Sequence, residues 1–180
     1  MTESRPEVAN SIQTGDFATN YHDVGAGSPV TLIHGSGPGV QAWANWQLVM
    51  PKLASGHRVI APDMVGFGYT ERPAGIQYTM STWTRQVIDL LDALHIERTD
   101  IVGNSFGGGL ALRLAIDYPD RIGRLVLMGS AGLNFPLTHG LDAVWGYTPS
   151  LENMRNVLLN FVDHKEMITD SLVESRYTAS

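Results

Sequence analysis

The sequence predicts an α/β fold built around a mostly parallel sheet. Short apolar and β-branched runs alternate along the chain with longer segments of helical periodicity. Strands that alternate with helices form βαβ units, whose crossovers are right-handed. The length of 180 residues, with 43% hydrophobic and 17% charged residues, is typical of one soluble globular domain.

Composition excludes several classes of function. The net charge is −6 and only two of the twelve cationic residues are lysines, which does not favour a nucleic-acid-binding face. The chain has no cysteine, so disulfides and thiolate metal sites are impossible. The polar N-terminal segment lacks the apolar core of a signal peptide, and no stretch reaches the roughly 18 apolar residues of a membrane helix. We therefore expect a cytoplasmic protein without membrane or nucleic-acid partners.

The first third of the chain is expected to contain two buried strands. Residues 1–15 are expected to form a leader with little structure, and residues 17–24 alternate loosely, as an edge strand does. The apolar runs at 30–33 and 58–63 predict buried strands. Residues 43–53, between those two strands, are expected to form a short helix.

The middle of the chain repeats the alternation. Apolar residues recur at helical spacing over residues 81–95, with Ser81 as the expected cap. A strand at 100–104, a helix at 106–118 and a strand at 124–128 follow, and the last of these is expected to have an open edge because no later strand covers it. After Gly132 the pattern changes: residues 133–150 have no clear period, 151–162 and 165–176 predict two helices, and no further buried strand is expected.

A serine stands at one predicted strand-to-helix junction. The stretch Gly103-Asn104-Ser105-Phe106-Gly107 fits G-x-S-x-G, the nucleophile elbow. Such a sharp turn strains the serine backbone, needs glycine two residues away on each side, and lifts the hydroxyl clear of the sheet. The first N–H groups of the helix, including that of Phe106, then point at a developing oxyanion. A glycine-rich turn with an incidental serine is the structural alternative.

A second loop follows the strand predicted at 30–33. Its sequence, HGSGPG, begins at His34 and is too rich in glycine for regular structure. This position in an elbow-bearing fold supplies the second oxyanion donor, here an N–H near Ser36 or Gly37. A flexible loop is the alternative. We expect His34 to be a structural hydrogen-bonding group in preference to a general base.

Together these features resemble the α/β-hydrolases. The stretches HGSGPGVQAWANW, APDMVGFGYTERP, DIVGNSFGGGLALRLAIDYPDRIGRLVLMGSAG and ESRYTAS narrow the resemblance to meta-cleavage product hydrolases, nearest to the 2-hydroxymuconic semialdehyde hydrolases. That resemblance implies serine-dependent hydrolysis of a C–C bond in a 2-hydroxy-6-oxo-dienoate made by extradiol ring cleavage. It also implies no metal, no organic cofactor and a homo-oligomeric enzyme.

The resemblance assigns roles to individual residues. It implies that Ser105 is the active-site serine, with Ser36, Gly37 and the Phe106 N–H at the oxyanion hole. Asn45 and Asn104 would hold the end of the substrate that carries the carboxylate and the 2-oxygen.

Arg176 would contact that same end of the substrate from a helical cap. The substrate is an anion, and ketonisation must precede cleavage so that electrons can return into a carbonyl. A guanidinium and two amides suit the stabilisation of that dienolate. A solvated arginine on a helix face is the alternative for Arg176.

The acid and the base of a triad are not evident. In this fold they follow the serine, after later strands and beyond the inserted cap. The histidines after Ser105 are His139, in an irregular segment, and His164, between the two predicted cap helices. Both are expected to be solvated. We therefore expect a partial sequence, in which 1–132 form the N-terminal part of the core, 133–180 begin the cap, and the last core strands are missing. The 180-residue chain itself is then expected to be inactive.

Two other functions are compatible with the same fold. A carboxylesterase or related acyl hydrolase would share the elbow, but it has less reason to assemble Asn45, Asn104 and Arg176. A non-catalytic ligand-binding protein on this scaffold can also retain the serine. Fold alone does not separate these functions.

Overall fold

The computed structural model describes residues 5–180, which divide into two compact units. Of the described residues, the core unit comprises 5–36 and Gln41–Gly132, and the helical unit comprises Gly37–Val40 and Leu133–Ser180. The four residues Gly37–Val40 thus group with the helical unit although they follow the third strand of the core unit in the sequence.

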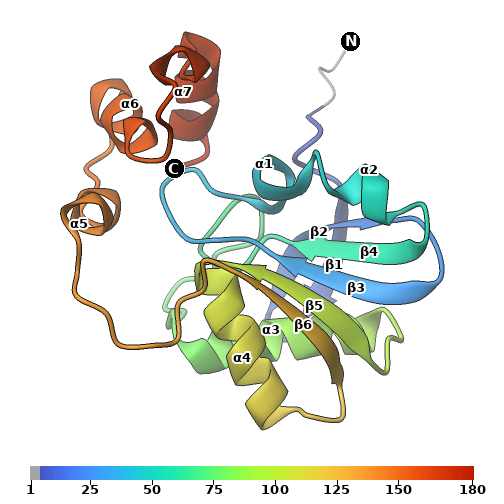
Figure 1. Ribbon diagram of the computed structural model, residues 1–180. Coiled ribbons are helices and arrows are strands. Elements are labelled where there is room, and N and C mark those ends of the chain that lie inside the picture. Colours follow the sequence, from blue (N-terminus) through green and yellow to red (C-terminus); the bar gives the residue numbers. More distant parts are fainter. Residues whose placement is uncertain (1–4) are drawn as a thin grey trace. The chain divides into compact units, whose positions relative to one another are not determined.

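The core unit is built on a six-stranded sheet (Figure 1). Three neighbouring pairs, β4 with β3, β3 with β5, and β5 with β6, are parallel, whereas β1 with β2 and β2 with β4 are antiparallel. The predicted α/β architecture with a mostly parallel sheet is confirmed. The strands, in the spatial order β1-β2-β4-β3-β5-β6, are β1 (Asn10–Thr14), β2 (Phe17–Val24), β4 (His57–Pro62), β3 (Ser28–Ile33), β5 (Thr99–Asn104) and β6 (Ile122–Met128).

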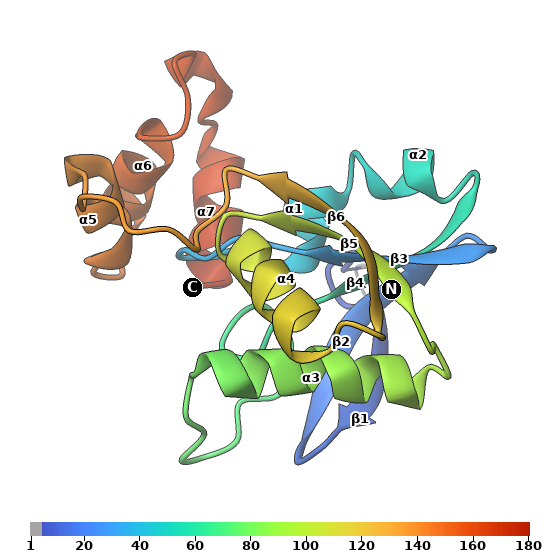
Figure 2. The same ribbon diagram turned by 60° about the horizontal axis from the view of Figure 1, so that its bottom comes forward.

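Helices cover both faces of this sheet. The short helices α1 (Ala42–Trp46) and α2 (Met50–Leu53) lie on one face, and α3 (Met80–Ala93) and α4 (Phe106–Asp117) lie on the other (Figure 1). Figure 2 shows α3 and α4 packed beside each other beneath the sheet.

Burial on both faces explains why the central strands are continuously apolar. Leu32 and Ile33 are adjacent in β3 and both are fully buried, but they point to opposite sides. Leu32 packs with Trp46 of α1, and Ile33 packs with Leu110 of α4. A strand covered on both sides has no polar face, so its sequence does not alternate.

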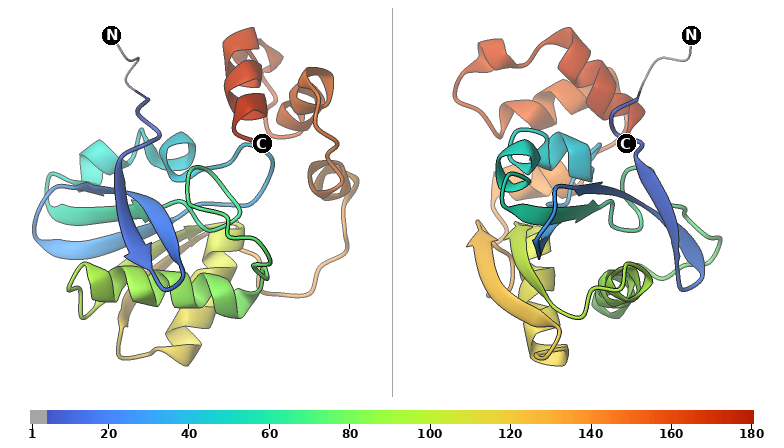
Figure 3. Two further views of the ribbon diagram at one scale, coloured as in Figure 1. Left: turned by 180° about the vertical axis from the view of Figure 1, so that it is seen from behind. Right: turned by 90° about the vertical axis from the view of Figure 1, so that its right-hand side faces the viewer.

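The expectation of little structure over residues 1–15 lies outside the described residues at 1–4 and is wrong at residues 10–14, which form β1. This strand pairs antiparallel with β2, so β2 is an interior strand and not the edge strand that was expected (Figure 3). The sequence NSIQT is mostly polar because β1 lies at the edge of the sheet, where Ile12 is its one apolar residue packed against the core and the buried Thr14 is hydrogen-bonded to Thr19. The turn into β2 uses Gly15, whose φ of +58° suits glycine.

Two predicted helices differ in detail from the observed ones. The helix expected at 43–53 is two helices, α1 and α2, and Pro51 lies in the first turn of the second. The cap of α3 is Thr79 and not Ser81. Thr79 has extended backbone, with φ −123°, and its hydroxyl accepts the N–H of Thr82 at 3.2 Å, which is the geometry of an N-cap.

The strand expected at 124–128 lies within β6, at the edge of the sheet, which confirms the prediction that its edge is left open. Among the residues that the structure describes, β6 pairs only with β5. Val126, Leu127 and Met128 keep exposed fractions of 55%, 41% and 46%. An apolar strand with one unpaired edge is a site for association with other chains.

The helical unit contains α5 (His139–Trp145), α6 (Leu151–Leu159), a 3₁₀ turn at Lys165–Met167, and α7 (Asp170–Thr178). Helix α5 lies in the segment for which no period was apparent, and its only buried residue is Val144, so it offers no apolar stripe to detect. A small cluster formed by Met154, Ile168 and Val173 holds α6 and α7 together.

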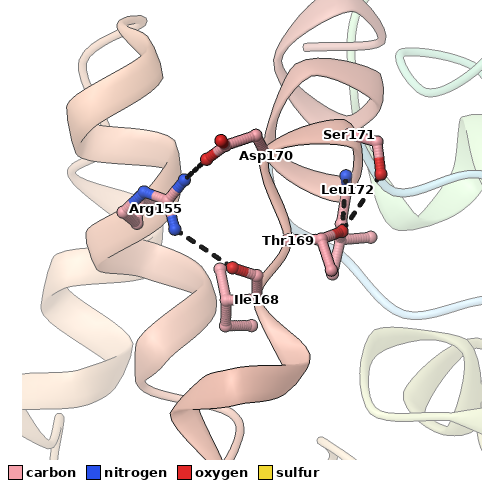
Figure 4. A network of polar contacts seen from close by, with 6 residues as sticks. All are labelled: Arg155, Ile168, Thr169, Asp170, Ser171 and Leu172. Carbon is pink, nitrogen blue, oxygen red and sulfur yellow. Dashed lines mark hydrogen bonds and ion pairs between the residues drawn. The ribbon is translucent and has the colours of Figure 1, made fainter.

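Polar contacts add to this small cluster (Figure 4). The Arg155 guanidinium in α6 donates to the Ile168 carbonyl at 3.1 Å and pairs with the Asp170 carboxylate in the first turn of α7. Thr169 caps α7 by accepting the N–H of Leu172 at 3.2 Å. Asp170 is largely exposed, so the ion pair contributes little stability. Together with the bond to the Ile168 carbonyl, the pair links Arg155 of α6 to the start of α7.

Candidate active site

Ser105 occupies the junction between β5 and α4 in a strained conformation. Its φ and ψ are +52° and −114°, and in the described chain only His95 is another non-glycine residue with positive φ. Such a conformation costs about 1–3 kcal/mol and persists only where the surroundings impose it. Here the Ser105 N–H donates to the Met128 carbonyl at 2.8 Å, and the Ser105 carbonyl accepts from Ala131 N–H at 3.0 Å. Both contacts come from the end of β6 and the residues that follow it.

The glycines around Ser105 are required by close backbone contacts. A Cβ atom on Gly103 would lie 2.4 Å from the Gly107 carbonyl oxygen. A Cβ atom on Gly107 would lie 2.2 Å from the carbonyl oxygen of Ile33, at the end of β3. Both contacts are far inside ordinary van der Waals separation, so α4 can start this close to β3 and β5 only with glycine at both positions.

The backbone N–H of Phe106 is available at the start of α4. Within the described part of the core unit it has no hydrogen-bond acceptor, as expected for the first residue of a helix. The Phe106 ring is held by an edge contact with Trp83, at a centroid separation of 4.7 Å, and by a tilted contact with Phe67 at 5.9 Å. The ring therefore fixes the residue that carries this donor.

The loop after β3 lies against Ser105. A Cβ atom built on Gly35 would be 3.4 Å from Ser105 Cβ and 3.3 Å from Asn104 Nδ2. The Gly35 N–H donates to Asn45 Oδ1 at 3.1 Å, which ties the loop to α1. Ser36 follows Gly35 directly, so the Ser36 N–H belongs to the next peptide group of this loop, close to the Ser105 junction.

Asn45 and Asn104 come together, and their orientation follows from the donors around them. Asn45 Oδ1 accepts from both Gly35 N–H and Asn104 Nδ2, each at 3.1 Å. Because a backbone N–H can only donate, the atom of Asn45 that faces it is the oxygen, and Asn104 must then present its amide nitrogen. The Asn45 Nδ2 group has no acceptor within the described core unit, so it remains available as a donor beside Ser105.

His34 is occupied by structural hydrogen bonds. Its ring is fully buried, its Nε2 accepts from Met64 N–H at 2.9 Å, and its Nδ1 is 2.6 Å from the Gly35 carbonyl oxygen. Burial lowers the pKa of His34, and the Gly35 carbonyl and Asp63 only partly oppose this. A neutral ring with both nitrogens engaged has no free position for a proton from Ser105. These bonds agree with the prediction that His34 is a structural hydrogen-bonding residue.

Asp63 is a buried structural residue that sequence reasoning did not single out. Its carboxylate accepts from Ala42 N–H at 2.7 Å, from Tyr69 N–H at 2.8 Å and from Asn20 Nδ2 at 2.8 Å. The bond to Ala42 holds the N-terminus of α1, the helix that carries Asn45. A signal was present in the sequence, since an aspartate directly after a buried strand and before a Gly-x-Gly turn often caps neighbouring backbone N–H groups.

Gly37 and Arg176 belong to the helical unit. The Arg176 guanidinium donates to the Gly39 carbonyl at 3.1 Å, and a Cβ atom on Gly39 would meet the Arg176 carbonyl oxygen at 2.1 Å. Arg176 is half-buried, has no carboxylate within 4 Å in the described part of that unit, and has its pKa lowered by burial. A half-buried guanidinium without a counter-ion is suited to bind an anion.

The two histidines after Ser105 also belong to the helical unit. His139 is exposed at the start of α5, and His164 is exposed and lies 3.1 Å from Glu166. Within the described core unit, no side chain is hydrogen-bonded to the Ser105 hydroxyl. Residues 5–180 contain no group of three or more potential metal-ligating carboxylate or imidazole side chains. The helices within the same residues are all too short or too polar to cross a membrane.

Comparisons with known proteins show which proteins this chain is similar to. A curated 2-hydroxymuconate semialdehyde hydrolase of Pseudomonas sp. (strain CF600) is 58% identical over 178 residues, which cover 99% of this chain and 63% of that protein. A 2-hydroxy-6-oxo-2,4-heptadienoate hydrolase of Pseudomonas putida is 56% identical, over 100% of this chain and 65% of its own length. The chain thus spans slightly under two thirds of these relatives.

A solved structure is similarly close. It is that of a mutant meta-cleavage product hydrolase from Pseudomonas fluorescens IP01, complexed with acetates. It superposes with a TM-score of 0.95 at 55% identity, covering 98% of this chain and 65% of that one. The family model for the alpha/beta hydrolase fold matches residues 28–175. This match covers most of the chain, which therefore belongs to the α/β-hydrolase fold family.

Proposed function

We propose that this chain is part of a serine-dependent hydrolase that cleaves a C–C bond in a 2-hydroxy-6-oxo-dienoate, the product of meta ring fission of an aromatic compound. The observation that carries the proposal is the strained Ser105 beside the Asn45–Asn104 pair. The names of the two curated relatives, each more than half identical over nearly the whole chain, support the same substrate class.

The polar end of the substrate would be held by amide and guanidinium donors. The free Nδ2 group of Asn45 and the remaining N–H of Asn104 can donate to the carboxylate and the 2-oxygen. Arg176, half-buried and without a carboxylate partner in the described helical unit, supplies the positive charge that offsets the dienolate. Proton transfer to the far carbon of the dienolate then generates the ketone that accepts electrons when the C–C bond breaks.

Ser105 acts at the other end, on the 6-carbonyl. As its hydroxyl adds to the carbonyl carbon, negative charge develops on the carbonyl oxygen. The N–H groups of Phe106 and Ser36, with Gly37 as a further candidate, donate to that oxygen. The bond between carbons 5 and 6 breaks, the electrons return to the dienol, and water releases the small acid. A serine needs a base and an orienting acid. We propose that both are supplied from outside residues 1–180.

The decisive experiment follows the coloured dienolate substrate by absorbance. Ser105→Ala should abolish cleavage while leaving substrate binding largely intact, because within the described core unit the hydroxyl makes no hydrogen bond that the fold would lose. Ser130→Ala is the matched control, since its hydroxyl lies beside α4 without a hydrogen-bond partner in the described chain. Turnover by Ser105→Ala within tenfold of the wild type would remove Ser105 from the mechanism.

The other two functions are separated by parallel assays on the same protein. An acyl hydrolase would turn over simple p-nitrophenyl esters far faster than the dienoate, and a binding protein would not label with a fluorophosphonate. Efficient dienoate cleavage together with labelling at Ser105 would exclude both. We also propose a cytoplasmic homo-oligomer, which cell fractionation and light scattering test directly.

A further inference from the structure

The peptide group that joins Gly35 to Ser36 is held from its carbonyl side by a buried ring. We propose that His34 is a positioning residue, which orients the Ser36 N–H toward the reacting oxygen by hydrogen bonding to the Gly35 carbonyl of the same peptide. This inference rests on the proposed function, because it takes the Ser36 N–H to be an oxyanion donor.

The argument begins with peptide geometry. The peptide bond is planar, and no cis bond occurs in the described chain, so a C=O group and the following N–H point in opposite directions. His34 Nδ1 lies 2.6 Å from the Gly35 carbonyl oxygen. Fixing the direction of that carbonyl therefore fixes the direction of the Ser36 N–H. A hydrogen bond to the carbonyl also polarises the peptide and makes its N–H a stronger donor.

The ring can do this only in one tautomer, and its other contact selects that tautomer. Met64 N–H donates to His34 Nε2 at 2.9 Å, so Nε2 must be unprotonated and the hydrogen must be on Nδ1. The edge of Phe67 packs against the ring at a centroid separation of 5.3 Å, and the side chain is fully buried. Burial lowers the pKa of His34, which keeps the ring neutral near pH 7.

The preceding peptide is held independently. Gly35 N–H donates to Asn45 Oδ1, and a Cβ at Gly35 would lie only 3.3 Å from Asn104. The loop therefore has one clamp on the Gly35 N–H and another on the Gly35 carbonyl. These two hydrogen bonds are expected to affect different kinetic steps. In the proposed function Asn45 also contacts the substrate and so affects binding, whereas His34 affects catalysis only by orienting the Ser36 N–H.

Two substitutions separate the two bonds of the ring. In His34→Asn the side-chain amide occupies the position of Nδ1 and can still donate to the Gly35 carbonyl, but the contact with Met64 is lost. In His34→Gln the longer side chain reaches the position of Nε2 and can still accept from Met64, but the contact with Gly35 is lost. Each variant loses one hydrogen bond in the same buried site, so their stabilities are expected to be similar.

Kinetics of the protein expressed from its whole natural reading frame then test the proposal. We expect His34→Gln to lower kcat by roughly tenfold or more, since loss of one oxyanion donor lowers kcat by about 10²–10³, with KM within about twofold. His34→Asn should retain several times more of the activity. Val87→Ala, which opens a cavity beneath α3 without removing either hydrogen bond of His34, controls for stability alone. Equal kcat values for the two His34 variants, or an effect confined to KM, would overturn the inference.

The same experiment separates this inference from the function on which it rests. If Ser105→Ala remains active, the proposed function fails; if Ser105→Ala is inactive and the His34 variants behave alike, only the inference fails. A measurement without substitution covers the case in which neither variant folds. Nitrogen-15 NMR of the wild-type imidazole at pH 7 should show the hydrogen on Nδ1, and a hydrogen on Nε2 would contradict the mechanism.

Discussion

Gly107, the second residue of α4, offers a direct test of why the Ser105 junction needs glycine. Gly107→Ala places a methyl group against the backbone of β3, whereas Gly109→Ala, two residues later in the same helix, does not. In the second case the nearest atom would be the Ala131 carbonyl oxygen at 3.4 Å, an ordinary contact. The two variants thus share the chemical change and the helix, and differ in the space available.

The expected magnitude follows from these distances. The methyl group on Gly107 would lie 2.2 Å from the Ile33 oxygen and 2.6 Å from the His34 oxygen, about 1 Å inside an ordinary carbon–oxygen contact of about 3.3 Å or more. Both obstructing atoms are backbone, so no side-chain rotation relieves the overlap. Overpacking costs about 1–3 kcal/mol, occasionally more, and alanine returns about 1 kcal/mol of helix propensity. Because the overlap is with backbone atoms, we take the upper end, about 3 kcal/mol, which less about 1 kcal/mol gives a net loss of about 2 kcal/mol for Gly107→Ala. Gly109→Ala should gain up to about 1 kcal/mol.

Urea denaturation followed by circular dichroism measures both values in the protein expressed from its whole natural reading frame. The slopes of the unfolding curves should match, so that the difference in midpoint reports stability. A Gly107→Ala variant that is as stable as Gly109→Ala would refute the reasoning, because it would show that α4 and β3 are not in close backbone contact. The dienoate assay should show the same order, since a displaced α4 moves Ser105 and the Phe106 N–H together.

Three further predictions follow from other features. Arg176→Ala should weaken binding of the dienoate and slow its ketonisation, a loss of about 2–4 kcal/mol in kcat/KM. Arg176→Lys should retain only part of the activity, because it keeps the charge without the planar guanidinium. Full activity of Arg176→Ala would show that Arg176 is a solvated residue without a role in binding. Burial lowers the pKa of His22 below its ordinary value of 6.5, so the unfolded chain takes up the proton first and stability should fall as the pH drops below about 6.5. His22→Phe, which keeps the ring contact with Trp43, should reduce this slope in urea titrations at pH 5 to 7, and an unchanged slope would exclude His22. Residues 1–180 alone should be inactive and should associate through the open edge of β6. Leu127→Lys should reduce that association, as measured by light scattering. A monomeric and active chain of residues 1–180 would contradict both expectations.

The sequence by itself determined most of the core unit. The continuous apolar runs that became β3 and β4 could be read because strands covered on both faces leave no polar positions. The G-x-S-x-G stretch predicted a strained serine between a strand and a helix, and Ser105 has a φ of +52° there. These signals can be recognised locally, because glycine spacing and helix propensity act over a few residues, although the contacts that require Gly107 and hold Ser105 come from β3 and the end of β6.

Elements that depend on distant partners were missed or misplaced. Strand β1 has little apolar character, and it exists because β2 offers a ladder of backbone groups and Ile12 reaches the core. Helix α5 buries only Val144, so its sequence has no stripe to read. The cap of α3 fell on Thr79 because the chain is extended there, which no pattern within the helix reveals.

The candidate site shows the same division. Sequence resemblance named Asn45 and Asn104, but only the fold joins them through one shared oxygen and thereby decides which amide group is free to donate. Sequence also suggested that His34 is structural. Its tautomer and its hold on the Gly35 carbonyl depend on Met64, thirty residues later in the chain, whose N–H the tertiary structure brings to 2.9 Å. The sequence therefore indicates which residues are candidates for the site. Which of their atoms donate and which accept is decided by contacts that form only in the folded chain.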